Sequence, residues 1–163
     1  MTWFGMASTK WLTRIRVESA ASDNHFMVKG YRYAYPGEDP LAAAPVEALR
    51  VKSLITRPLE GAVLRPGPVA VRGFAWAGAA GVKLAEVSSD GGSSWREATL
   101  TGEASPGAWR AWEAQVDASR SGDLVLLARA TDGAGESQPI AARANAGGYG
   151  NNSIHQVTVH VRA

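Results

Sequence analysis

The sequence predicts an all-β fold, and three observations support this prediction. From about residue 48 onward, short apolar segments follow one another, each bounded by the Gly, Pro, Asp or Ser residues that separate strands. The chain carries 18 Gly and 8 Pro in short clusters, which favours turns over long helices. No helical period of useful length appears. About seven short strands with turn signals at near-regular spacing are typical of an immunoglobulin-like β-sandwich, which we expect over residues 48–163.

The first 47 residues differ from the rest of the chain. Residues 10–18 alternate in a way that predicts a half-buried strand, whose apolar side consists of Trp11, Thr13, Ile15 and Val17. Residues 19–48 carry aromatic residues and turn formers without a sustained period, so they predict an irregular connector with one short strand around residues 26–29. Thirty residues without regular structure are uncommon inside a compact domain. We therefore expect this connector to cross between domains or to lie along a partner surface.

Three segments of the expected sandwich have specific patterns. Asp90, Gly91 and Gly92 form a strong hairpin signal, because this triplet tolerates the positive φ angles of a tight turn. Residues 124–130, LVLLARA, are apolar on both faces and predict a central strand. The last strand alternates well, with its inward side formed by Val157, Val159 and Val161 and its outward side by Gln156, Thr158, His160 and Arg162.

Tryptophan is abundant, with six residues in the chain, and two of them flank an arginine in GAWRAWEA. Trp109 and Trp112 are three residues apart, so on a strand they face opposite sides. We expect one to pack in the core and the other to be exposed at an interface or as a platform for a sugar, with two sheet-packing aromatics as the alternative. Arg110 between them is suited to hold an anion bidentately, although a solvated strand arginine is the simpler interpretation.

The composition argues against several classes of function. The chain has no cysteine, and its three histidines, His25, His155 and His160, show no metal-ligand spacing. No nucleophile or phosphate-binding motif is present, and SDGGSSW has too few acidic ligands for a calcium loop. The net charge is only +2 and the basic residues are scattered, so we expect no nucleic-acid partner. No apolar run approaches the roughly 18 residues of a membrane span, and we expect no membrane contact.

Several motifs together resemble one known family. The opening segment WFGMASTKWLTRI resembles the end of the molybdopterin domain in the sulfite oxidase family. Later segments resemble, in the same order, the strands of that family's C-terminal dimerisation domain, namely GFAWAG, EVSSDGGSSWREATL, AWRAWEAQV, ARATDGAGESQP and GYGNNSIHQVTVHV. The resemblance implies that residues 1–47 are a remnant of an α+β molybdopterin-binding domain with its connector, and that residues 48–163 are an immunoglobulin-like dimerisation domain.

The resemblance also implies what a complete protein of this kind does. Family members oxidise sulfite to sulfate or catalyse related oxygen-atom transfers, and they pass electrons to a haem or cytochrome. Their upstream domain holds molybdenum through a molybdopterin dithiolene and one cysteine thiolate. They form homodimers through the immunoglobulin-like domain, and we expect the face or edge with the last strand to make the contact. The resemblance favours the periplasm, while the sequence itself fixes neither compartment, substrate nor electron acceptor.

Individual residues match the family's motifs. Ser8, Thr9 and Lys10 occupy the positions that contact the pterin, with Thr9 where the family usually has Val. Arg110 is the nearest candidate for the arginine that reaches the substrate anion, but it aligns poorly because the chain is shorter around it. Ile154 also departs from the pattern, since an aromatic residue is common there.

The isolated chain is expected to be inactive. It contains no cysteine to bind molybdenum, so we expect it to bind no molybdenum and to oxidise nothing alone, and Met1 to be an internal start or an assembly boundary. The alternative from another class is a free-standing immunoglobulin-like binding or adhesion module, whose exposed Trp residues touch a sugar or a protein.

Overall fold

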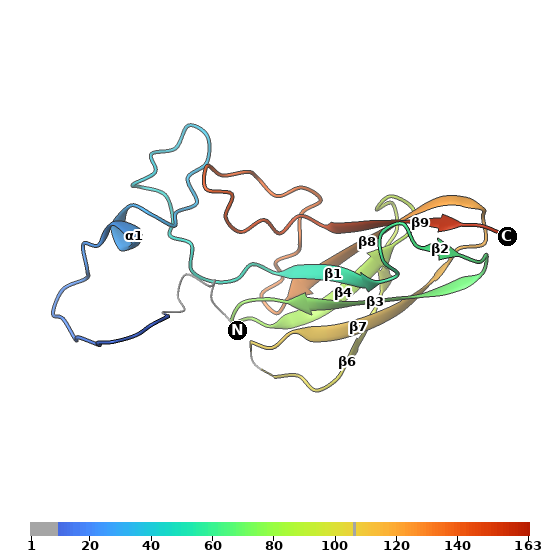
Figure 1. The fold of residues 1–163 in the computed structure, drawn as a ribbon, viewed down its shortest axis with the longest axis horizontal. Helices are drawn as coiled ribbons and strands as arrows, with labels where there is room; N and C mark the ends of the chain where they lie inside the picture. The colour runs from blue at the N-terminus through green and yellow to red at the C-terminus, as the bar shows by residue number, and fades with distance from the viewer. Residues whose placement is uncertain (1–9, 106) are drawn as a thin grey trace.

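Two β-sheets packed face to face form the body of the protein in a computed structural model, which describes residues 10–105 and 107–163 (Figure 1). The four-stranded sheet has the order β1-β3-β7-β6, with bounds Lys52–Arg57, Pro68–Trp76, Arg110–Asp117 and Thr99–Thr101. The five-stranded sheet has the order β2-β9-β8-β4-β5, with bounds Val63–Leu64, His155–Val161, Gly122–Asp132, Val82–Ser88 and Arg96–Glu97. All neighbours are antiparallel except β2 and β9. The prediction of an all-β immunoglobulin-like sandwich is confirmed.

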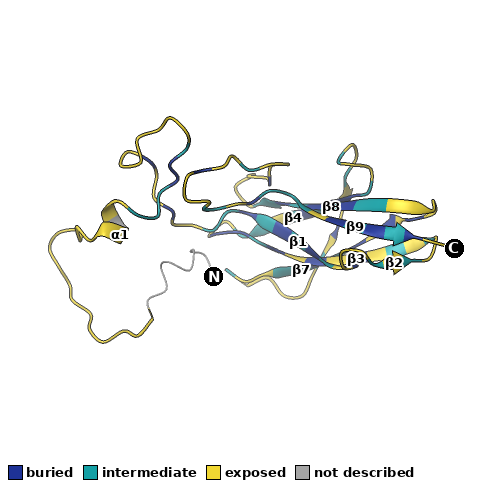
Figure 2. Cartoon of the chain, turned by 45° about the horizontal axis from the view of Figure 1, so that its top comes forward, coloured by how far each residue is buried: buried dark blue, intermediate teal, exposed yellow. Residues whose placement is uncertain are grey.

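The core lies between the sheets, and Figure 2 shows buried residues on strands of both. Alternate residues of the long strands are the buried ones. Val157, Val159 and Val161 are buried on β9, as predicted. Residues 124–130 belong to β8, which lies between β9 and β4 and is therefore the predicted central strand. The four-stranded sheet contributes the inward residues Val71, Ala75, Trp112, Ala114 and Val116.

Trp112 is the largest fully buried side chain of the core. It pairs in register with Gly73 of β3. A Cβ atom on Gly73 would overlap the Trp112 indole and the carbonyl oxygen of Leu54. Glycine at position 73 therefore allows the indole to lie flat against the backbone of the neighbouring strand.

The predicted hairpin at residues 90–92 joins β4 to β5. Gly91 and Gly92 have φ angles of 75° and 88°, in the left-handed region that favours glycine. The Asp90 carboxylate accepts hydrogen bonds from the Ser88 hydroxyl at 2.7 Å and from the Ser94 backbone N–H at 3.0 Å. Hydrogen bonds from Ser94 and Ser88 lower the pKa of Asp90, so the charged carboxylate closes the loop.

Two predictions for the N-terminal region are wrong. Residues 10–18 form no strand, and Trp11 and Val17 are 96% and 99% exposed. An alternating sequence predicts an apolar and a polar face for a strand, but a strand also needs a neighbouring strand for its backbone hydrogen bonds. No strand of the described chain pairs with residues 10–18. Around residues 26–29 the structure has the helix α1, His25–Val28, because Asn24 caps it by accepting the Phe26 N–H at 3.0 Å.

Candidate interaction site

Three rings form an aromatic cluster, Phe74, Trp76 and Trp109, on the outer face of the four-stranded sheet. Phe74 and Trp76 point outward because the alternate residues of β3 fill the core. The Trp109 ring stacks on Trp76 with centroids 4.9 Å apart and 20° between planes, and it lies 6.2 Å from Phe74. Trp109 is 57% exposed, whereas Trp112 is 2% exposed. The prediction of one core and one exposed tryptophan is confirmed.

The face around the aromatic cluster combines small, apolar and charged side chains. Leu54 and Ala111 flank Phe74 in register on the neighbouring strands and are partly exposed. Further along the same face, Arg72 Nε lies 2.7 Å from Glu113 Oε2. This surface therefore has an apolar end and an ion pair beside it.

The outer face of the five-stranded sheet has a different character. Arg129 forms two hydrogen bonds with Glu86, at 2.7 and 3.1 Å, and its guanidinium lies 4.1 Å from the centre of the Trp95 ring. His160 Nδ1 lies 2.7 Å from Asp123. Among the described residues of this sheet, Val63 on the short edge strand β2 is the one large hydrophobic residue that is exposed. An Arg–Glu pair and a His–Asp pair within the chain thus mark this face.

Arg110 begins β7 and points toward the inside of the sandwich. It pairs in register with Ala75, which pairs with Ser53, and both of these residues are completely buried. Residues that pair directly across strands share a face, so the half-buried Arg110 lies on the inner face while Trp109 faces outward. Arg110 Nε is buried and has no hydrogen-bond partner within the described chain. The expected role of Arg110 at a substrate anion stays a prediction.

The connector folds back on the end of the sandwich and forms a joint there, made of residues 31–46 and the loop 140–153 (Figure 1). Backbone hydrogen bonds link Ala146 N to Ala34 O at 2.9 Å and Val46 N to Tyr31 O at 2.7 Å. Arg143 lies 4.0 Å above the centre of the Tyr35 ring. Two segments about a hundred residues apart in the sequence thus form one layer.

Arg50 occupies the centre of this joint. Its guanidinium lies 4.2 Å from the centre of the Tyr33 ring and donates to the Tyr35 hydroxyl at 3.0 Å. It also reaches the Gly150 carbonyl oxygen at 3.5 Å. Burial raises the pKa of Tyr33, which stays neutral beneath the cation. This arrangement was not predicted from the sequence. The two stretches that form it are recognisable in the sequence as the tyrosine-rich YRYAY and the glycine-rich NAGGYGNN.

Two buried amides hold the loop 140–153 to the sandwich. Gln138 is 4% exposed, and its Oε1 accepts the Ala130 N–H at 2.9 Å. Its Nε2 donates to the carbonyl oxygens of Asn152 and Ser153, each at 3.2 Å. Asn152 Nδ2 in turn donates to the Val51 carbonyl oxygen at 3.3 Å. These bonds fix the joint relative to both sheets.

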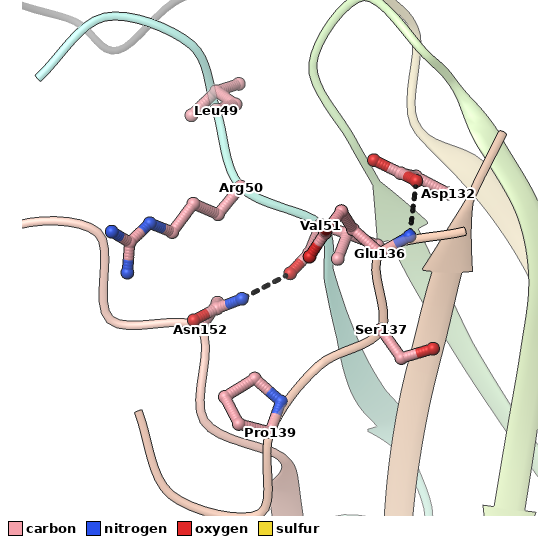
Figure 3. A pocket seen from close by; sticks show the side chains of 8 residues that line it. All are labelled: Leu49, Arg50, Val51, Asp132, Glu136, Ser137, Pro139 and Asn152. Carbon is pink, nitrogen blue, oxygen red and sulfur yellow. Dashed lines mark hydrogen bonds between the residues drawn. The ribbon is translucent and has the colours of Figure 1, made fainter. Parts of the chain in front are cut away.

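A pocket of about 470 Å³ lies beside the joint (Figure 3). Its rim includes Arg50, Val51 and Asn152 on one side and Asp132 and Glu136 on the other. The Asp132 carboxylate is already engaged, because it accepts the Ala134 and Glu136 N–H groups at 2.9 and 3.0 Å in the turn after β8. The pocket between the joint and the sandwich thus has a mixed lining, in which Leu49 and Pro139 stand beside the polar groups.

The residues predicted to contact a pterin are only partly described. Ser8 and Thr9 lie outside the described residues, and Lys10 is exposed. Their contact with a pterin stays a prediction. No group of three or more His, Asp or Glu side chains that could hold a metal ion occurs in the described chain. No helix of the described residues is long and apolar enough to cross a membrane.

Comparison with known proteins identifies the family of this sandwich. A family model described as the Mo-co oxidoreductase dimerisation domain matches residues 43–162. The chain belongs to this family. The dimerisation domain thus accounts for both sheets and for the loop 140–153, and the sequence resemblance to sulfite oxidase-type enzymes is confirmed.

Relatives extend the likeness to nearly the whole chain. Mitochondrial sulfite oxidase of Mus musculus is 36% identical over 171 residues, a match that covers 96% of this chain and 31% of the relative. Sulfite oxidase of Arabidopsis thaliana is 30% identical over 178 residues, covering 96% of this chain and 44% of the relative. The crystal structure of the sulfane dehydrogenase SoxCD from Paracoccus pantotrophus superposes with a TM-score of 0.79 at 26% identity, covering 99% of this chain and 44% of that chain. The chain therefore spans less than half the length of these relatives.

The donor set of this chain does not fit a molybdenum site. The family name implies a molybdenum cofactor in the complete proteins. The chain has no cysteine to supply a thiolate, and the described residues form no group of metal-ligating side chains. A dimerisation domain with this composition can shape the surroundings of a cofactor held elsewhere, and no chemical step is assigned to it.

Proposed function

We propose that this chain is the C-terminal dimerisation portion of a molybdenum-cofactor oxidoreductase of the sulfite oxidase type. The observation that carries the proposal is the family match over residues 43–162, together with relatives that the chain covers over only part of their length. In the complete protein, two copies pair through the sandwich, and an upstream molybdopterin domain precedes it. The joint around Arg50 supports this arrangement, because it fixes the segment that leads from the sandwich to whatever precedes it.

We further propose the chemistry of the complete protein. It oxidises sulfite to sulfate, or carries out a related oxygen-atom transfer, and gives the electrons to a cytochrome or haem. Ser8, Thr9 and Lys10 contact the pterin, and Arg110 contributes positive charge toward the substrate anion. The sulfite oxidases among the relatives support this reaction class. The buried, unpaired Nε of Arg110 supports a further partner for that side chain.

The isolated chain has a non-catalytic role in this proposal. We expect the purified chain to contain far less than one molybdenum per chain by elemental analysis and to show no sulfite-dependent reduction of an artificial electron acceptor. We expect light scattering to give twice the mass of one chain. Stoichiometric molybdenum or sulfite turnover would contradict the non-catalytic role, and a monomer at about 100 μM would contradict pairing through the sandwich.

A further inference from the structure

We propose that a second copy of this chain docks on the outer face of the four-stranded sheet, with the aromatic cluster at the centre of the contact. This inference rests on the proposed function, because it presumes that two copies of the chain pair. It adds which face of the sandwich makes the contact and which residues lie at its centre. It differs from the sequence-based expectation, which placed the contact at the face or edge with the last strand.

The aromatic cluster is exposed to solvent. Trp109 is 57% exposed and Phe74 39%, although each ring is large and apolar. Aromatic side chains at the centre of an interface dominate binding energy, and Trp is among the most enriched hot-spot residues. The rings are also preorganised, because Trp109 stacks on Trp76 at 4.9 Å and so loses little freedom when it is covered.

The other exposed apolar residues of the sandwich are scattered. Leu59, Val63 and Ile140 are exposed singly in turns or on an edge strand. Exposed apolar residues that stand alone are common on soluble proteins and need no partner. On the outer face of the five-stranded sheet, the Arg129 guanidinium lies 4.1 Å from the centre of the Trp95 ring and pairs with Glu86, so this ring already has a partner within the chain. Within the described sandwich, the aromatic cluster is where exposed large rings contact one another.

The outer face of the four-stranded sheet carries both charges that a self-complementary contact needs. In a twofold pair the same patch meets itself, so the patch must match its own charges. Arg72 and Glu113 lie side by side at 2.7 Å, with their side chains 61% and 42% exposed. A twofold axis that passes between Arg72 and Glu113 would place the Arg72 of each copy opposite the Glu113 of the other. The small residues Ala70 and Ala111 on the same face allow a close approach of the two sheets.

The occupant follows from the family. The family model is that of a dimerisation domain, so a second copy is the partner that this sandwich is built to receive. A stable dimer buries about 800 Å² on each copy, which requires a sheet face rather than one ring. The four-stranded sheet offers the aromatic cluster as the centre and the Arg72–Glu113 pair as a polar rim. An upstream domain or a sugar on the same rings are alternative occupants that the test separates.

The test compares Trp109→Glu with Val63→Glu in the full 163-residue chain. The two positions are matched in exposure, at 57% and 62%, and Trp109 directly precedes β7 of the four-stranded sheet whereas Val63 lies on β2 of the five-stranded sheet. Val63 is on β2, beside the last strand, so it also tests the sequence-based expectation. We expect Trp109→Glu to weaken the dimer about thirtyfold or more in sedimentation equilibrium, and Val63→Glu to leave it unchanged. Circular dichroism confirms that each variant is folded, and Trp109→Gln and Phe74→Ser replace any variant that is not.

A charge reversal tests the self-complementary arrangement. Arg72→Glu and Glu113→Arg should each weaken the dimer several-fold, and the double variant should restore it. A dimer that persists in Trp109→Glu but dissociates in Val63→Glu would overturn the proposed face and leave pairing intact. A wild-type chain that is monomeric at about 100 μM would overturn both the proposed pairing and the proposed face, and the cluster would then belong to another occupant.

Discussion

The imidazole of His155 on β9 accepts the backbone N–H of Ile55 on β1 through Nδ1, at 3.1 Å. This hydrogen bond joins the two sheets, and it requires Nδ1 to be free of a proton. Burial, and secondarily the charge of Lys52, lower the pKa of His155. The neutral imidazole is therefore part of the folded structure.

The stability of the sandwich should fall in mild acid because of His155. Above the ordinary histidine pKa of 6.5, the folded and unfolded chains both carry a neutral ring, and the contribution of the hydrogen bond is fully present. As the pH falls below that value, the unfolded chain binds a proton that the folded chain resists, so stability is lost. Urea unfolding at pH 8 and pH 5 measures the difference.

Variants isolate the histidine responsible. His155→Leu should cost about 1–3 kcal/mol at pH 8, because the buried Ile55 N–H loses its acceptor, and it should reduce the pH dependence. His160→Gln is the matched control, since His160 pairs with the exposed Asp123 on the same sheet, and this substitution should cost far less stability at pH 8. An unchanged pH profile in His155→Leu would contradict the assignment.

Gly73→Ala should destabilise the fold by about 1–3 kcal/mol. The added methyl group would overlap the Trp112 indole and the Leu54 carbonyl oxygen, so one of them must move. Thermal unfolding followed by circular dichroism measures the loss. Ala70→Ser, at an exposed position of the same strand, should cost far less. Equal stability of the two variants would show that the indole adapts freely.

Arg50→Ala should loosen the joint while the sandwich stays folded. The change removes the cation above Tyr33 and the hydrogen bond to the Tyr35 hydroxyl, each worth about 1 kcal/mol. We expect limited proteolysis to cleave faster within residues 31–46 and hydrogen exchange to rise at Ala146, with little change in the unfolding midpoint of the sandwich. Arg120→Ala, at an exposed arginine outside the joint, is the control. Equal cleavage rates in both variants would exclude Arg50 as the centre of the joint.

Gln138→Ala should destabilise both the joint and the sandwich. The buried amide satisfies the Ala130 N–H of β8 and the carbonyl oxygens of Asn152 and Ser153. Removing it leaves buried backbone groups unpaired, at a cost of about 1–3 kcal/mol. Gln115→Ala, at an exposed position on β7, should stay within about 0.5 kcal/mol of the wild type in urea unfolding. If both variants unfold at the same urea concentration, the amide has no structural role.

Much of the sandwich could be predicted from the sequence because its strands carry their own patterns. Val157, Val159 and Val161 alternate with polar residues, and the predicted face is the buried one. Trp112 is buried and Trp109 is exposed, as the two-residue period of a strand requires for residues three apart. The same reasoning failed for residues 10–18, since an alternating pattern does not supply a neighbouring strand.

The joint could not be predicted in this way. Arg50, Tyr33 and Tyr35 share no period, and their arrangement depends on the loop 140–153 reaching them through tertiary contacts. The pairing of Arg110 with Ala75 likewise joins distant segments and is not specified by a local pattern, although the inward direction of Arg110 follows the two-residue period from Trp112. Register between distant strands is set by the assembled core rather than by any one segment.

The position of β9 has a consequence for synthesis in the cell. This last strand lies between β2 and β8, so the five-stranded sheet stays split until residues 155–161 have left the ribosome. Until then, the strands made earlier expose apolar side chains, because pairing between strands that are distant in the sequence is slow. A nascent chain of this domain is thus a natural client for chaperones that shield unpaired strands, and losing only the final few codons of β9 would leave an open, aggregation-prone sheet.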